Sequence, residues 1–69
     1  MIVFHLDEII HKRGRSYYWV TQQTGISGQN LKKIASNKTD RVFLNTLERL
    51  CNCLDCSFDD LMEIVEENE

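Results

Sequence analysis

The sequence contains no proline and only three glycines among its 69 residues. Hairpin-rich folds use both residues at their turns, so this shortage favours helices. No uncharged apolar run is longer than Met1–Phe4, which is far too short to span a bilayer. The N-terminus also lacks a basic region followed by an apolar stretch, so no signal peptide is predicted. We therefore expect a cytoplasmic protein that does not bind membranes.

The chain has three cysteines, an odd number, which points to a reducing compartment rather than a disulfide framework. Hydrophobic residues make up 42% of the sequence, enough for the core of one small domain spanning residues 1–69. A chain this short leaves little room for a deep active site, and no serine or cysteine lies at a catalytic spacing from a histidine. We predict that it is not an enzyme and that it uses no cofactor or small-molecule substrate.

Charge is distributed unevenly along the chain. Residues 1–41 carry seven basic and three acidic side chains, a net charge of +4. Residues 42–69 carry one basic and eight acidic side chains, a net charge of −7. A protein that binds a polyanion with one face has this kind of asymmetry, although ordinary solvated charge can also produce it.

Apolar residues recur at helical spacing in five segments. The residues that share the inner face of each segment are, in chain order, Leu6, Ile9 and Ile10; Tyr17, Val20 and Thr24; Leu31 and Ile34; Leu47, Leu50, Cys51 and Leu54; and Phe58, Leu61, Met62 and Val65. The segment Met1–Leu6 is apolar and predicts either a short strand or an extended arm. The predicted fold is an all-α bundle of five helices, and we expect a frayed tail over residues 66–69.

Glycine and small polar residues separate these segments. Gly25 predicts a left-handed turn after the second helix, with Ile26 buried just beyond it. Asn45, with Glu48 three residues later, predicts a capping box at the start of the fourth helix. The remaining boundaries are Gly14 at the end of the first helix, the N-caps Ser16, Ser27 and Ser57 of the second, third and fifth helices, a polar loop over Asn37–Arg41 and an extended segment over Val42–Leu44.

The second and third helices and the turn between them have the pattern of a helix-turn-helix. The segment Ser16–Asn37, SYYWVTQQTGISGQNLKKIASN, resembles the DNA-binding core of the Cro/lambda-repressor-like (XRE-type) helix-turn-helix family. The segment Leu44–Met62, LNTLERLCNCLDCSFDDLM, is similar to the two closing helices of that family. The resemblance is closest to minimal bacterial regulators that consist of this domain alone. It implies sequence-specific binding to double-stranded DNA and transcriptional repression, with the third helix in the major groove.

The resemblance also implies which residues face DNA. Gln29 and Asn30 can form paired hydrogen bonds with adenine, and lysines can reach guanine or neutralise phosphates. Three residues depart from the family pattern. Thr21 replaces a preferred alanine, Tyr17 replaces a common glutamine that bridges to the third helix, and Gly28 removes one side chain that could read a base. The candidate DNA-binding residues are Ser16, Tyr17, Ser27, Gln29, Asn30, Lys32, Lys33, Lys38, Thr39 and Arg41.

Specific recognition by so small a module generally needs two half-sites, so we expect a homodimer. Candidate dimer surfaces are the Ile2–Phe4 arm and the fifth helix with Ile64 or Val65. The alternative function is a protein-interaction module, antitoxin-like or adaptor, that uses the same fold without specific DNA binding.

The three cysteines admit a further hypothesis. Cys51, Cys53 and Cys56, together with His5 or His11, have the chemistry of a zinc site, which would make the chain a redox sensor. Cys51 falls on an inner helical face, however, and free cysteine packs well as a small hydrophobic residue. We favour core packing, predict no metal site, and expect Cys53 to be the exposed thiol.

Overall fold

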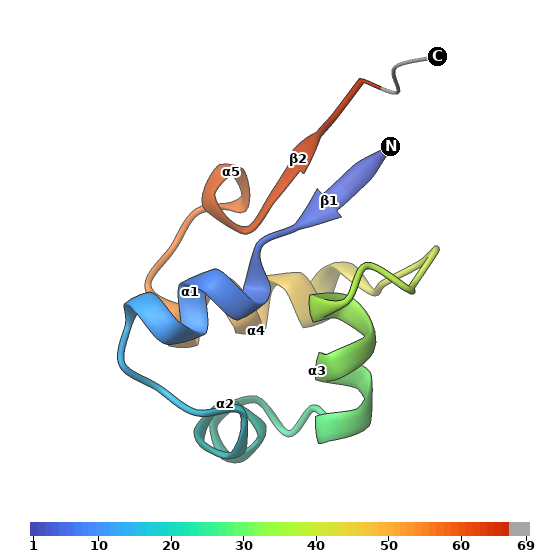
Figure 1. Cartoon of the computed structure of the whole chain (residues 1–69). Helices are drawn as coiled ribbons and strands as arrows, with labels where there is room; N and C mark the ends of the chain where they lie inside the picture. Colours follow the sequence, from blue (N-terminus) through green and yellow to red (C-terminus); the bar gives the residue numbers. More distant parts are fainter. Residues whose placement is uncertain (67–69) are drawn as a thin grey trace.

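The computed structural model describes residues 1–66 and contains five helices and two short strands (Figure 1). In chain order the elements are β1 (Ile2–Phe4), α1 (Leu6–Lys12), α2 (Tyr17–Thr24), α3 (Gly28–Ala35), α4 (Leu44–Leu54), α5 (Phe58–Leu61) and β2 (Met62–Ile64). The predicted five-helix bundle is confirmed, and the N-terminal segment, for which a strand and an extended arm were both open, forms a strand. None of the described helices is long and apolar enough to cross a membrane.

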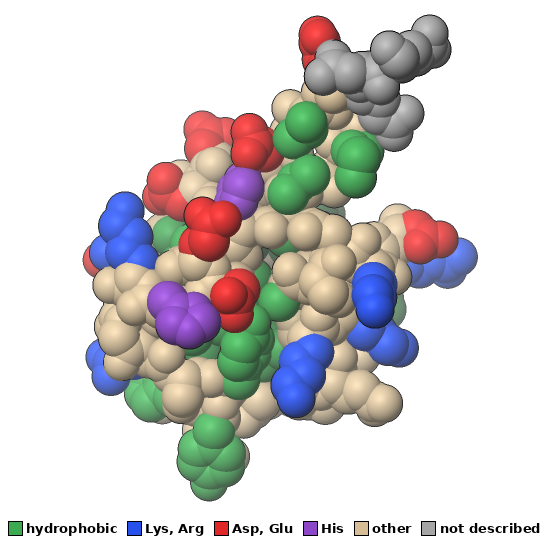
Figure 2. All heavy atoms as spheres, in the orientation of Figure 1, with side chains coloured by type: hydrophobic (Ala, Val, Ile, Leu, Met, Phe, Trp, Pro, Cys, Tyr) green, Lys and Arg blue, Asp and Glu red, His purple; other side chains and the backbone are tan. Residues whose placement is uncertain are grey.

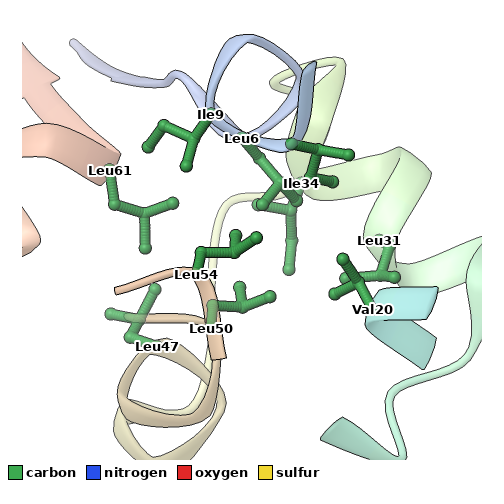
Figure 3. Packing of buried hydrophobic residues seen from close by; sticks show 10 residues of the cluster. Leu6, Ile9, Val20, Leu31, Ile34, Leu47, Leu50, Leu54 and Leu61 are labelled. Atoms are coloured by element: carbon green, nitrogen blue, oxygen red, sulfur yellow. The ribbon is translucent and has the colours of Figure 1, made fainter. Parts of the chain in front are cut away.

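Leucine, isoleucine and valine side chains from all five helices form one core (Figure 3). These residues lie on the helical faces that the apolar spacing predicts. The side chains with almost no exposed surface are Leu6, Ile10, Val20, Leu31, Leu50, Leu54 and Leu61. Each helix is short, so its stability comes mainly from burying this face and only secondarily from its own propensity.

Serine side chains begin three of the helices, as predicted. Ser16 Oγ accepts the Trp19 N–H at 3.1 Å, and Ser27 Oγ accepts the Asn30 N–H at 3.2 Å. At α5, Ser57 and Asp60 form a reciprocal capping box. Gly25 has a φ of +76°, which confirms the predicted left-handed turn after α2. The C-cap of α1 is Arg13, and Gly14, with a φ of +68°, follows it by one residue.

The predicted cap of α4 is wrong. The helix begins at Leu44 rather than after Asn45, and its N-cap residue, Phe43, makes no side-chain capping bond. The Phe43 carbonyl accepts the N–H groups of Thr46 and Leu47, so Asn45 already lies inside the first turn and cannot cap it. The extended segment predicted over Val42–Leu44 therefore ends at Phe43.

The C-terminal prediction also needs correction. The fifth helix ends at Leu61, and Met62–Ile64 forms a strand antiparallel to β1, with Ile2 opposite Ile64 and Phe4 opposite Met62. Of the predicted inner face, Leu61 is buried, whereas Phe58 and Val65 are exposed. Pairing with β1 provides backbone partners that a longer helix would have made internally. The frayed tail predicted over residues 66–69 lies, from residue 67 onward, outside the described residues.

Candidate nucleic-acid interface

The turn between α2 and α3 is held by a small set of local bonds. The buried Thr24 hydroxyl donates to the Val20 carbonyl at 2.7 Å and accepts the Ile26 N–H at 3.1 Å. The Arg49 guanidinium donates to the Thr24 carbonyl at 3.4 Å, which links α4 to the end of α2. Ile26 is half-buried against the core rather than fully buried. These contacts fix the position of α3 relative to α2.

Helix α3 presents a polar face to the surface. Its two apolar side chains, Leu31 and Ile34, are buried against the bundle. The predicted outward residues are all exposed: Gln29, Asn30, Lys32 and Lys33. Figure 2 shows lysine and arginine side chains over α3 and the following loop, whereas the visible acidic side chains gather mainly around α1 and α5. The surface over α3 and its loop is therefore mainly basic.

A shallow hollow separates α3 from the loop that follows it. Its polar lining comes from Asn30, Lys33, Thr39, Arg41 and Thr46, and its apolar lining comes from Ile26, Ile34, Val42 and Phe43. The Thr39 hydroxyl donates to the Arg41 carbonyl at 2.6 Å, which holds the loop in shape. The structure therefore brings four of the predicted residues together around a site that suits an anion. Lys38 is exposed beside it in the same loop.

The two serine caps lie at the exposed starts of α2 and α3. Ser16 and Ser27 each accept one backbone N–H through the side-chain oxygen. Each hydroxyl keeps its own proton, which it can donate to a phosphate. A helix N-terminus also carries a partial positive charge that favours an anion.

The sequence prediction missed Arg15. Its guanidinium lies over the Trp19 ring, 4.2 Å from the ring centroid, directly ahead of the Ser16 cap. This contact places a cation beside the start of α2. Arg13, two residues earlier, has a different role, because its guanidinium donates to the carbonyls of Leu54 and Asp55 at 2.8 Å each. The sequence feature that could have identified Arg15 is an arginine directly before a capping serine, with an aromatic residue four positions later.

The Tyr17 hydroxyl forms a hydrogen bond within the chain. Its hydroxyl donates to Asp7 Oδ1 at 2.5 Å, joining α2 to α1. Burial, together with the hydrogen bond to the Asp7 carboxylate, raises the pKa of Tyr17 to about 12. This geometry favours a role for Tyr17 in orienting α1 against α2 over a direct phosphate contact.

This raised pKa predicts a specific alkaline sensitivity. The folded state keeps the Tyr17 proton up to about pH 12, whereas the unfolded chain loses it near the ordinary pKa of 10.0. The stabilisation is therefore complete below pH 10.0 and is lost as the pH rises toward 12. Over that range, the free energy of unfolding of the wild type should fall more steeply than that of Tyr17→Phe in denaturant titrations. Parallel curves for the two proteins would contradict the assignment.

The cysteines lie together at the end of α4, and all three are half-buried against the core. Cys53 is not the exposed thiol that the sequence predicted, because its Sγ donates to the Leu50 carbonyl at 3.6 Å. Burial raises the pKa of each of the three thiols, for Cys56 to about 11. Among residues 1–66, no group of three histidine, cysteine or acidic side chains is placed to hold a metal ion.

Thr21 and Gly28, two of the three departures from the family pattern, are neighbours. A Cβ at position 28 would lie 3.9 Å from Thr21 Cγ2, an ordinary van der Waals contact. The Thr21 hydroxyl donates back to the Tyr18 carbonyl at 2.6 Å, so it is satisfied within α2. The larger residue on α2 thus faces the smallest residue on α3.

Replacing the two glycines near the turn, Gly25 and Gly28, by alanine should change the stability of the protein in opposite directions. Gly25→Ala forces a side chain into the left-handed region and should cost about 1–2 kcal/mol. Gly28→Ala meets no clash and should raise the free energy of unfolding by about 0.5 kcal/mol. This is the low end of the gain expected for replacing a helical glycine, because residue 28 is the first of α3. Urea denaturation of both variants measures the difference. Equal effects would show that the turn does not depend on its left-handed residue.

Taken together, a left-handed glycine turn, serine-capped helices and an outward polar face on α3 define a helix-turn-helix DNA-binding domain. Comparison with known families agrees, because residues 5–67 match the model of the Cro/C1-type helix-turn-helix DNA-binding domain. The chain belongs to this family, which comprises DNA-binding transcriptional regulators and is not an enzyme class.

A relative supports the family assignment, and a solved structure supports the fold. The chain is 31% identical over 62 residues to the uncharacterized HTH-type transcriptional regulator YozG of Bacillus subtilis (strain 168), a match covering 90% of this chain and 74% of the relative. The fold also matches the crystal structure of a protein from Bacteroides fragilis assigned as DNA-binding. That match has a TM-score of 0.80 at 21% identity and covers 91% of this chain and 100% of the other. We conclude that the chain is a DNA-binding transcriptional regulator.

Proposed function

We propose that this regulator represses transcription by binding a specific DNA operator as a homodimer, with α3 of each copy in the major groove. The observation that carries the proposal is the division of α3 into two faces. Leu31 and Ile34 lock it to the core, while Gln29 and Asn30 stand exposed beside its N-terminus. A recognition helix needs this arrangement, because its first turns must reach base edges while its other face stays fixed.

The proposed contacts divide into those that read bases and those that bind the backbone. Gln29 and Asn30 are the base readers, since each amide can donate and accept at one adenine. Phosphate contacts come from the hollow beside α3, from the serine caps and from Arg15. The complete phosphate-binding set is Arg15, Ser16, Ser27, Lys32, Lys33, Lys38, Thr39 and Arg41, with either lysine of α3 also able to reach guanine. Tyr17 supports this surface through Asp7.

The charge distribution favours one orientation on DNA. The basic loop and α3 face the duplex, and the acidic α5 region is directed away, where it limits nonspecific binding. A homodimer would place two recognition helices on half-sites about one helical turn apart. Repression then follows from occupancy, because a promoter covered in this way excludes polymerase.

Selection from a random duplex library tests the proposal while the operator is still unidentified. We expect enrichment of an inverted repeat whose half-sites are about 10 base pairs apart, centre to centre. The Gln29→Ala, Asn30→Ala double variant serves as the control and should enrich no sequence. If the wild type also enriches none, specific DNA reading is contradicted and the protein-interaction alternative takes its place.

A further inference from the structure

We infer that Cys51 and Cys56 form a reversible intramolecular disulfide at the end of α4 when a small, uncharged peroxide oxidises the protein. The inference goes beyond the proposed function and does not depend on DNA binding. It makes the stability of the folded chain respond to the redox conditions around it.

The turn that ends α4 brings these two cysteines together. Asp55 has the left-handed conformation, with a φ of +51°, and the Cys51 carbonyl accepts its N–H group. The same carbonyl accepts the Cys56 N–H at 3.0 Å. A bond that spans six residues in this way belongs to the Schellman motif, in which the side chains of the first and sixth residues meet. It also limits the two Cα atoms to a separation of less than about 7 Å, and disulfides generally span roughly 4.4–6.8 Å.

The two thiols also interact with each other. Cys51 and Cys56 are half-buried against the core and line one hollow at the surface, with Phe58 of α5 beside them. Burial is the main reason that the pKa of each thiol is raised. A hydrogen bond between the two thiols opposes the rise in the pKa of Cys51 and adds to the rise in the pKa of Cys56. Cys51 is therefore the thiol that ionises more easily and attacks an oxidant first.

Cys53 lies on another side of α4. Its Sγ donates to the Leu50 carbonyl at 3.6 Å, so the side chain is turned toward the preceding turn of the helix. Residues two positions apart on a helix do not face each other, which separates Cys53 from Cys51. The charge of Cys56 nevertheless contributes to the raised pKa of Cys53. A bond between Cys53 and Cys56 is therefore the alternative that a test must distinguish.

The charge around the hollow selects the class of oxidant. Glu48 lines the hollow, and the negative charge of Asp60 contributes to the raised pKa of both Cys51 and Cys56. Arg13 acts on Cys56 in the opposite direction, but its effect is smaller. An anionic oxidant such as oxidised glutathione is repelled by this acidic surrounding, whereas hydrogen peroxide is small and uncharged.

Hydrogen peroxide accepts the two electrons that the reaction releases. The Cys51 thiolate attacks one peroxide oxygen, the O–O bond breaks, and the leaving hydroxide takes up the proton that Cys51 released, forming water. The Cys56 sulfur then attacks the sulfur of the Cys51 sulfenic acid, so the S–S bond forms and the S–O bond breaks. The hydroxide that leaves takes the thiol proton of Cys56 and forms a second water. A dithiol reductant restores both thiols by exchange.

The disulfide closes the loop to which the end of α1 is bound. The Arg13 guanidinium donates to the carbonyls of Leu54 and Asp55, which lie between the two cysteines. In Figure 1 this end of α4 lies beside α1, whereas the start of α4 lies beside α3 and the loop after it. Oxidation should therefore stabilise the α1–α4 contact and leave the surface of α3 unchanged. We expect the ratio of unfolded to folded molecules to fall by about tenfold or more.

Peptide mapping after treatment of the folded protein with hydrogen peroxide tests the site. The oxidised protein is unfolded in iodoacetamide, which blocks free thiols, and is cleaved before Asp55, which separates Cys56 from the other two cysteines. We expect the two peptides to stay joined in the wild type and in Cys53→Ala, the matched control, and to separate in Cys51→Ala. Urea denaturation should show the tenfold stabilisation only in the proteins that keep the link, and dithiothreitol should reverse it.

The wild type alone decides the outcome if a variant does not fold. Tandem mass spectrometry of the joined peptides locates the bond at Cys51 or at Cys53, and a bond at Cys51 supports the inference. A bond at Cys53, thiols that stay free or become sulfinic acid, or links only between separate chains each overturn it. A link that is lost in folded Cys53→Ala and kept in folded Cys51→Ala also overturns it. None of these results depends on whether the protein binds DNA.

Discussion

Replacing both Gln29 and Asn30 by alanine is expected to remove most of the preference for the operator over a scrambled duplex. Both side chains are exposed on α3, and each well-placed pair of bonds to a base contributes about 1–3 kcal/mol, or about 5- to 150-fold. The helix cap should survive, because Ser27 binds the backbone N–H of residue 30 and not its side chain. Fluorescence anisotropy on the two duplexes measures the loss.

Two further variants show which kind of contact is lost. Asn52→Ala removes an exposed asparagine from α4 and should leave both affinities unchanged. Lys33→Ala should weaken binding to both duplexes about equally. It should also lower the slope of log affinity against log salt concentration by about one, the loss expected for one phosphate contact. Retention of the operator preference in the Gln29, Asn30 double variant would contradict the assignment of α3 as the reading helix.

Replacing Leu50 by alanine is expected to destabilise the folded chain strongly. Leu50 has no exposed surface and lies among Leu47, Leu54 and other core side chains (Figure 3). A cavity at such a position costs about 2–5 kcal/mol. The free energy of unfolding of a small domain is about 5–15 kcal/mol in total, so a large share of the variant molecules should unfold in mild denaturant.

Urea denaturation followed by circular dichroism checks this, and Leu44→Ala supplies the comparison. Leu44 lies on the same helix but is exposed, so its replacement should change the free energy of unfolding by less than about 0.5 kcal/mol. Similar losses in the two variants would mean that the stability of the chain does not reside in the leucine-rich core around Leu50.

The helical faces and most caps could be predicted because they depend on local chemistry. A leucine or isoleucine every three or four residues identifies a buried face, and serine before such a run identifies an N-cap. The start of α4 was misplaced because Asn45 has the composition of a cap, whereas the chain uses the backbone of Phe43. Propensity favours a residue for a role but does not determine where the helix begins.

Contacts between distant residues could not be predicted in the same way. The segment 61–65 contains both helical and strand-forming residues, and its pairing with β1 spans about 60 positions of the chain. The bonds from Tyr17 to Asp7 and from Phe4 to Asn37 likewise depend on how the helices pack. Within the candidate site, the exposed residues of α3 followed from spacing, whereas the hollow between α3 and its loop required the fold.

If this chain is a sequence-specific regulator, it must prefer its operator to other DNA even when electrostatic attraction is weakened. Fluorescence anisotropy compares the selected operator with a scrambled duplex of the same composition at two salt concentrations. We predict that both affinities fall as salt rises, because phosphate contacts are screened, while the preference for the operator persists. Equal binding to both duplexes that disappears together at higher salt would contradict sequence-specific reading.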